Sequence, residues 1–99
     1  MATKAEKEYM SRVADLGCIC CNMLGFPDTP AELHHIRTGQ GMSQRASNYE
    51  IIPLCPTHHR TGDYGTAYHR GSAAFEEKFG TELQLLAVVK EALNEGLDG

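Results

Sequence analysis

The stretch IIPLCPTHHRTG, residues 51–62, carries the pattern that decides the fold. The apolar residues up to Leu54 are typical of a short strand, which we expect over residues 49–54, and Pro56 suits the first turn of a following helix. Two residues separate Cys55 from His58, so these side chains lie about one helical turn apart. This spacing predicts one half of a zinc site where the strand meets the helix.

A second pair with the same spacing lies upstream. Cys18 and Cys21 follow Gly17, which permits the tight backbone turn of a zinc knuckle. Structural zinc takes four ligands at tetrahedral corners, and two short pairs brought together by folding supply them. We interpret the intervening cysteine, Cys20, as a core residue beside the site. The predicted ligands of one structural Zn²⁺ are Cys18, Cys21, Cys55 and His58.

Length and composition indicate one small domain. The chain has 99 residues, of which 41% are hydrophobic, and no apolar run reaches the ~18 residues that a membrane span requires. Residues 1–8 are charged and lack the apolar stretch of a signal peptide. We therefore expect a cytoplasmic protein without a membrane partner. In that reducing compartment, cysteines serve as metal ligands more often than they form disulfides.

Short elements are expected around the two ligand pairs. Residues 3–16 predict an amphipathic helix, residues 31–36 and 49–54 two strands, and residues 72–79 and 81–95 two further helices. Thr81 and Gln84 form a capping box for the last helix. Its expected inward residues are Leu83, Leu86, Val89 and Leu93, and Gly96 is expected to end it. The prediction is a single α+β domain over residues 1–99, with a zinc-stabilised core over residues 17–80 and flanking helices.

The histidines form a second group. His34 and His35 are adjacent, and His59 and His69 follow within a few tens of residues. Neighbouring side chains on a regular strand point to opposite faces, so His34 and His35 serve one site only if the strand ends or bulges there. His59 lies about 100° around the helix from the zinc ligand before it. One helix can therefore connect the zinc site to a second centre.

Two runs together resemble a known family. ELHHIRTGQGM, residues 32–42, followed by IPLCPTHHRTG, residues 52–62, resembles the ββα-metal core of HNH endonucleases, which is treble-clef-like. In detail the runs are similar to the phage recombination enhancement function (Ref) nucleases, which act with RecA filaments. The resemblance covers residues 18–80. It implies a DNA endonuclease, encoded by a phage or prophage in a bacterial host, with DNA and a RecA-type recombinase filament as partners.

The resemblance also implies roles for single residues. His35 corresponds to the general base that activates water, and the middle position of the motif falls on Glu50 or on nearby Asn48. One divalent catalytic ion, Mg²⁺, Mn²⁺ or Zn²⁺, is implied beside that base. Its ligands would be His34, His59 and His69.

The charge pattern suits a local contact with DNA. The net charge is −4, but residues 33–71 contain four arginines against two acidic residues, a local charge of +2, and the flanks carry −6. Arginine binds phosphate oxygens through paired hydrogen bonds. The candidate phosphate contacts are Arg37, Arg45, Arg60 and Arg70.

Two other functions fit part of the pattern. A noncatalytic zinc module that binds nucleic acid or a recombinase filament would use the same zinc ligands, but it has no need of His35 beside a metal-binding histidine. A thiol enzyme built on the CICC run, residues 18–21, would leave Cys55 and His58 unexplained, and no βαβ pattern accompanies the run. We therefore favour the nuclease.

Overall fold

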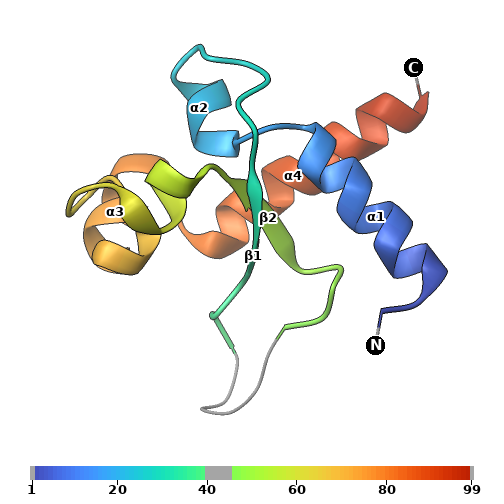
Figure 1. The fold of residues 1–99 in the computed structure, drawn as a ribbon, viewed down its shortest axis with the longest axis horizontal. Coiled ribbons are helices and arrows are strands. Elements are labelled where there is room, and N and C mark those ends of the chain that lie inside the picture. The colour runs from blue at the N-terminus through green and yellow to red at the C-terminus, as the bar shows by residue number, and fades with distance from the viewer. Residues whose placement is uncertain (1, 40–45, 99) are drawn as a thin grey trace.

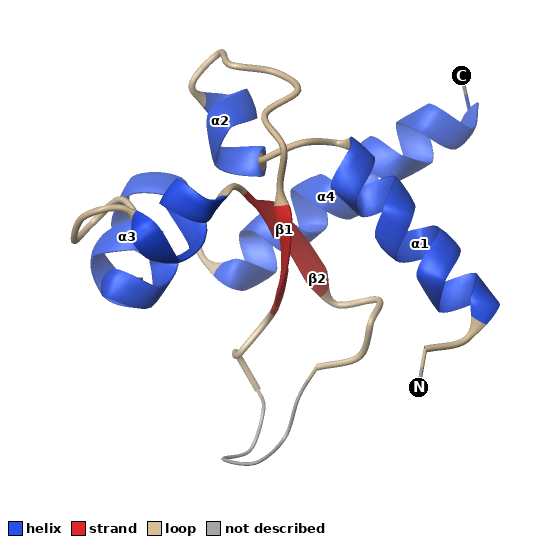
Figure 2. Cartoon of the chain, viewed as in Figure 1, coloured by secondary structure: helices blue, strands red, loops and turns tan. Residues whose placement is uncertain are grey.

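The structure is a computed structural model that describes residues 2–39 and 46–98, with side chains up to residue 94. It is a small α+β fold with one two-stranded sheet and helices around it (Figures 1 and 2). The elements in order are α1 (Lys4–Asp15), α2 (Ile19–Met23), β1 (Glu32–His35), β2 (Ile51–Leu54), η1 (Thr57–Thr61), η2 (Tyr68–Arg70), α3 (Ser72–Phe79) and α4 (Glu82–Asp98).

The sheet is the centre of the molecule. β1 and β2 pair antiparallel, with His34 opposite Ile52 and His35 opposite Ile51. All four residues of β2 are buried, because α1 and α4 both contact this strand. Figure 2 shows the two strands between α1 on one side and α3 on the other. β1 is less covered: His34 is buried, and the other three residues of the strand are half-buried.

The N-terminal helix lies where the sequence predicts one. Thr3 and Glu6 cap it reciprocally, and Val13 on its inner face is fully buried. Gly17 follows with a φ of 75°, and a Cβ at this position would lie 3.1 Å from the carbonyl oxygen of Thr29. Only glycine fits that turn without strain, and the turn leads the chain directly into the first cysteine pair.

The last helix differs from the prediction in two respects. Leu83, expected to face inward, is 53% exposed, and Leu85 is buried in its place. Glu82, the first residue of α4, is also buried, and with Leu85, Leu86, Val89 and Leu93 it lies on one helical face, from which Leu83 points away. The predicted end at Gly96 is also wrong, because α4 continues to Asp98.

No helix in the described part of the chain is both long and apolar enough to span a membrane.

Candidate metal centres

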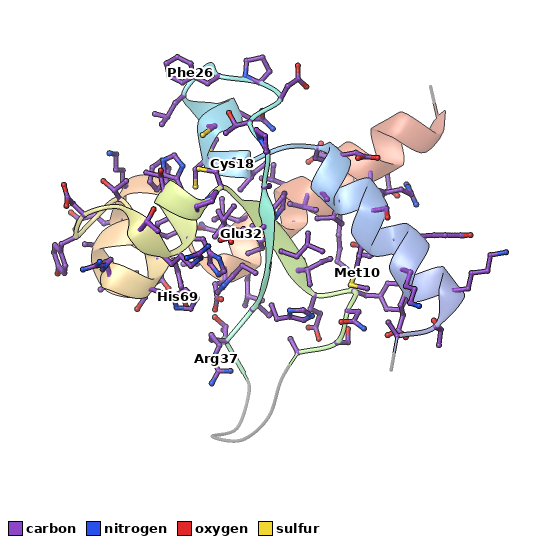
Figure 3. The ribbon with its side chains drawn as sticks, viewed as in Figure 1. Met10, Cys18, Phe26, Glu32, Arg37 and His69 are labelled. Atoms are coloured by element: carbon purple, nitrogen blue, oxygen red, sulfur yellow. The ribbon has the colours of Figure 1, made fainter. Side chains whose placement is uncertain are left out.

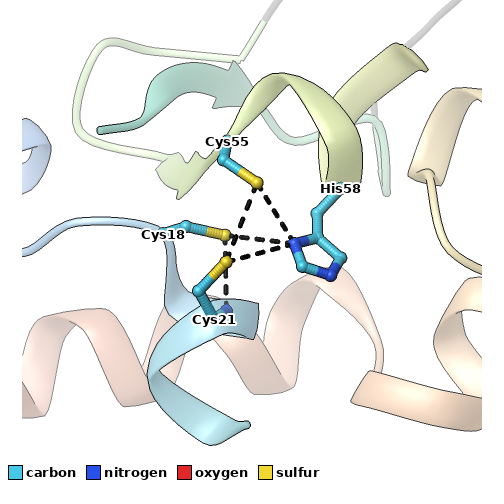
Figure 4. Close-up of side chains that lie close together, drawn as sticks. All are labelled: Cys18, Cys21, Cys55 and His58. Carbon is cyan, nitrogen blue, oxygen red and sulfur yellow. Dashed lines mark hydrogen bonds between the residues drawn. The ribbon is translucent and has the colours of Figure 1, made fainter. Parts of the chain in front are cut away.

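Three cysteines and one histidine meet beside the sheet. We call Cys18, Cys21, Cys55 and His58 the cysteine cluster (Figure 4). Nδ1 of the histidine lies 3.5, 3.6 and 3.2 Å from the sulfur atoms of Cys18, Cys21 and Cys55, respectively. The sulfur atoms of Cys21 and Cys55 are 3.8 Å apart. The two pairs that the sequence separates by more than 30 residues therefore lie together.

The spacing of these atoms fits a tetrahedral ion. With metal–sulfur bonds of about 2.3 Å and a metal–nitrogen bond of about 2.0 Å, ligand atoms at tetrahedral corners lie roughly 3.5–3.8 Å apart. The observed separations fall at or just below these values, and the donor set is the one that zinc prefers. The cysteine cluster is close enough to bind a metal such as zinc.

The local backbone prepares this cluster. The backbone N–H of Cys21 donates to the sulfur of Cys18 at 3.4 Å, as the knuckle turn requires. The buried thiol of Cys20 hydrogen-bonds to Cys18 and, with backbone N–H groups, lowers the pKa of Cys18 to about 4. Burial raises the pKa of Cys21 to about 11. Because the thiolate is the ligand form, Cys20 supports the cluster without belonging to it.

Three histidines form a second group, which we call the histidine triad: His34 on β1, His59 on η1 and His69 on η2. Nδ1 of His34 lies 3.3 Å from Nε2 of His59, and Nε2 of His69 lies 3.1 Å from that same atom. Figure 3 labels His69, which lies on η2. A tetrahedral ion with nitrogen ligands at about 2.0 Å would separate them by about 3.3 Å. Three ligands leave its fourth position open.

The short helix η1 contributes one residue to the cysteine cluster and one to the histidine triad. In η1, His58 points into the cysteine cluster and His59 into the histidine triad. The turn is wide, with the N–H of Gly62 bonded to the carbonyl of Thr57 at 3.0 Å. A Cβ on Gly62 would lie 2.3 Å from that carbonyl oxygen, so the turn requires glycine. Isolated wide turns of this kind frequently occur at functional sites.

Carboxylates hold two of the triad rings. Nε2 of His34 lies 2.6 Å from the carboxylate of Glu82, and Nδ1 of His59 lies 3.0 Å from that of Glu32. A carboxylate can only accept, so these two ring nitrogens carry the protons. Metal-binding histidines usually make this second hydrogen bond, which fixes the tautomer and the ring orientation.

The same tautomers place two lone pairs face to face. With the protons on the carboxylate side, Nδ1 of His34 and Nε2 of His59 carry lone pairs and lie only 3.3 Å apart. Burial lowers the pKa of His34, which disfavours a doubly protonated ring, and burial together with His59 lowers the pKa of His69. In these tautomers neither of the two facing nitrogens has a proton to donate across the contact. A cation bound between the two nitrogens would accept both lone pairs.

Both supporting carboxylates are ionised. Burial alone would raise the pKa of Glu82, but hydrogen bonds from Thr38, His34 and the backbone outweigh it, so the pKa lies below its ordinary value. Hydrogen bonds from Arg60 and then His59 lower the pKa of Glu32 to about 2. Two negative charges therefore lie next to the triad, against the rings of His34 and His59, and they favour a bound cation.

His35 lies apart from the triad. Its Nε2 is 2.9 Å from Oδ1 of Asn48, whose amide nitrogen lies 3.2 Å from the carboxylate of Glu6 on α1. The strand is regular up to its end at His35, so the two adjacent histidines face different partners. Of the two residues that the sequence left open for the middle position, Asn48 contacts His35. The Glu50 carboxylate instead accepts from the Ser47 N–H at 3.4 Å.

The predicted arginine contacts have unequal surroundings. The guanidinium of Arg60 binds the Glu32 carboxylate at 2.8 Å, so this arginine supports the ring of His59. Arg70 is exposed and donates to the carbonyl of Arg60 at 3.3 Å. Arg37 is exposed at the end of β1 (Figure 3). Arg45 lies outside the described residues.

The sequence reasoning missed both carboxylates. Glu82 occupies a position four residues before Leu86 and seven before Val89, on the inward face of α4, where a hydrophobic side chain is expected. A charged residue at such a position was the available signal. Glu32 precedes the histidine pair by one strand repeat, so it shares a face with His34, but periodicity does not distinguish it from a solvated side chain.

Comparison with known proteins identifies the family of this chain. A family model described as "Recombination enhancement, RecA-dependent nuclease" matches residues 2–94. The chain is also 35% identical over 83 residues to YdfU of Escherichia coli (strain K12), an uncharacterized protein. That match covers 82% of this chain and 21% of the relative, so the chain spans about a fifth of YdfU. By the family match over nearly its whole length, the chain belongs to the recombination-enhancement, RecA-dependent nucleases.

Proposed function

We propose that this chain is a metal-dependent DNA nuclease of the HNH type that acts in recombination with a RecA filament. The observation that carries the proposal is the 3.3 Å contact between Nδ1 of His34 and Nε2 of His59, with each ring's proton turned to a carboxylate. β1, β2 and η1 would form the ββα-metal unit around this centre. The family description supports nuclease activity and RecA dependence.

The cysteine cluster and the histidine triad would have different tasks. The cysteine cluster supplies four ligands and suits a structural Zn²⁺. The triad supplies three and leaves room for substrate. A divalent ion there, Mg²⁺, Mn²⁺ or Zn²⁺, would stabilise the charge that develops on the phosphate and on the leaving oxygen.

His35 is the proposed general base. Oδ1 of Asn48 accepts from Nε2 of His35, so the ring's lone pair is on Nδ1, from which it can take a proton from water. The amide of Asn48 is oriented because its nitrogen donates to Glu6. We therefore assign the middle position of the HNH motif to Asn48 rather than to Glu50.

The substrate contact is proposed for Arg37 and Arg70. Arg70 directly follows the triad ligand His69, and Arg37 follows β1 by two residues, so both lie near the proposed metal. Bidentate hydrogen bonds to phosphate oxygens would hold the DNA backbone beside the triad. Arg60 would act indirectly, through Glu32 and His59.

The test is nicking of supercoiled plasmid by the purified chain in Mg²⁺, Mn²⁺ and Zn²⁺, with and without a RecA filament on the DNA. We expect cleavage in at least one ion, faster with the filament, and abolished by His35→Ala. A chain that binds DNA but cleaves it in none of the three ions would instead be the noncatalytic zinc module.

A further inference from the structure

Glu82 joins the histidine triad to the backbone that follows β1. Its side chain is 1% exposed and lies 2.6 Å from Nε2 of His34. The same carboxylate accepts the backbone N–H of Arg37 at 2.8 and 2.9 Å, and both the N–H and the hydroxyl of Thr38, at 2.8 and 2.7 Å. One buried side chain from α4 therefore fixes a metal-facing ring and two loop residues.

We propose that Glu82 is a positioning residue that couples metal occupancy of the triad to the placement of Arg37 and Thr38. The inference rests on the proposed metal centre. It goes beyond that centre by connecting the ion to the residue proposed to contact phosphate. Glu82 itself touches neither the ion nor the DNA.

The physical path runs through the His34 ring. A cation at Nδ1 withdraws electron density, so the proton on Nε2 becomes a stronger donor to the carboxylate of Glu82. A stronger bond from His34 to Oε2 of Glu82 holds the carboxylate more firmly, and this keeps Oε1 in place for Thr38. Because linkage is reciprocal, a phosphate that fixes Arg37 would in turn tighten metal binding.

Glu32 provides a matched control. It binds Nδ1 of His59 at 3.0 Å, much as Glu82 binds His34. Its remaining contacts, however, are with the guanidinium of Arg60, so it holds a side chain instead of the backbone after β1. Glu32→Gln should therefore weaken the metal site without breaking the connection to residues 37 and 38.

The experiment separates the two metal sites by spectroscopy. Co²⁺ bound to the cysteine cluster has thiolate charge-transfer absorption, whereas Co²⁺ on the triad has only imidazole ligands. In the wild type we expect two equivalents of Co²⁺ to bind, and the thiolate absorption should appear with the first. Glu82→Gln should reduce the affinity of the second equivalent about 10- to 100-fold and leave the first unchanged.

Amide hydrogen exchange then reports the coupling, with diamagnetic Zn²⁺ replacing Co²⁺. Filling the second site should slow exchange at Arg37 and Thr38 in the wild type and in Glu32→Gln, but not in Glu82→Gln. If Glu82→Gln loses its native circular dichroism, Thr38→Val replaces it. This variant removes the hydroxyl contact with Glu82 and keeps the backbone one, and it should lower the second affinity several-fold with the thiolate signal intact.

Two results would overturn the inference alone. One is an affinity for the second Co²⁺ equivalent that is the same in Glu82→Gln, or in its substitute Thr38→Val, as in the wild type. The other is slowing of the amides in Glu82→Gln as in the wild type. A wild type that binds only the thiolate equivalent would instead refute the metal centre, and with it the proposed function.

Discussion

Nε2 of His34 and the carboxylate of Glu82 lie 2.6 Å apart, although 48 residues separate them in the sequence. The contact places Glu82, the first residue of α4, against His34 on β1. α4 is therefore part of the candidate site as well as a packing element. It also contacts β2, so the core and the site share one helix.

Removing the metal from the cysteine cluster should unfold much of the chain. A structural zinc contributes on the order of 10 kcal/mol in a small domain, and the sheet and α2 both pack around this cluster. Exhaustive chelation followed by circular dichroism and thermal melting tests it. An unchanged spectrum and melting midpoint after verified metal loss would show that the cluster is not structural.

The adjacent histidines should give opposite phenotypes. His34→Ala should empty the triad of its ion, because it deletes a ligand, while His35→Ala should retain the ion and lose cleavage. Metal content per chain and plasmid nicking are measured on both variants. The assignment of ligand and base would be reversed if His35→Ala lost the ion and His34→Ala kept it.

The pairs of ligands were predictable because their spacing is short and local. Cys18 with Cys21, and Cys55 with His58, each lie within one turn, so the sequence nearly determines their geometry. The strands and the capped helices follow from periodicity in the same way. His69 was grouped with the other histidines from the sequence, but its role as a ligand came only from the family resemblance, and the structure places it 3.1 Å from His59.

Glu82 and Asn48 show where sequence reasoning ends. Their partners lie 48 and 13 residues away, and only tertiary packing brings them together. On α4 the predicted inward residues Leu86, Val89 and Leu93 are buried, and only Leu83 was placed wrongly. A buried glutamate violates the apolar pattern, and here the hydrogen bonds from His34 and Thr38 offset its burial.

Two arginines should differ in their effect on DNA binding. Each phosphate that the protein neutralises contributes about −0.9 to the slope of log affinity against log salt. Arg37→Ala should flatten the slope by about that amount, because Arg37 is exposed and close enough to His69 to act on its charge. Arg60→Ala should leave the slope nearly unchanged, because the proposed task of this guanidinium is to hold Glu32 against His59. Binding titrations at several salt concentrations measure both. Equal flattening by the two variants would contradict the distinction.

Tyr68 should make the fold sensitive to alkali. Burial, and then the negative charge of Glu82, raise its pKa to about 12 from an ordinary value of 10.0. A raised folded pKa contributes stability that is complete below pH 10 and lost as pH rises toward 12. The melting midpoint of the wild type should therefore fall relative to Tyr68→Phe over this interval. A constant difference between the two midpoints from pH 9 to 12 would show that the pKa is not raised.

The central claim is that the histidine triad is the catalytic metal centre, and His59→Ala tests it most directly because this ring contacts both other members. The measurement is the plasmid nicking rate of His59→Ala against wild type, each with its thiolate-bound metal verified, and with the exposed Lys78→Ala on α3 as control. We predict a loss of at least about 100-fold for His59→Ala and none for the control. Cleavage by His59→Ala at the wild-type rate, with the cysteine cluster filled, would contradict the claim.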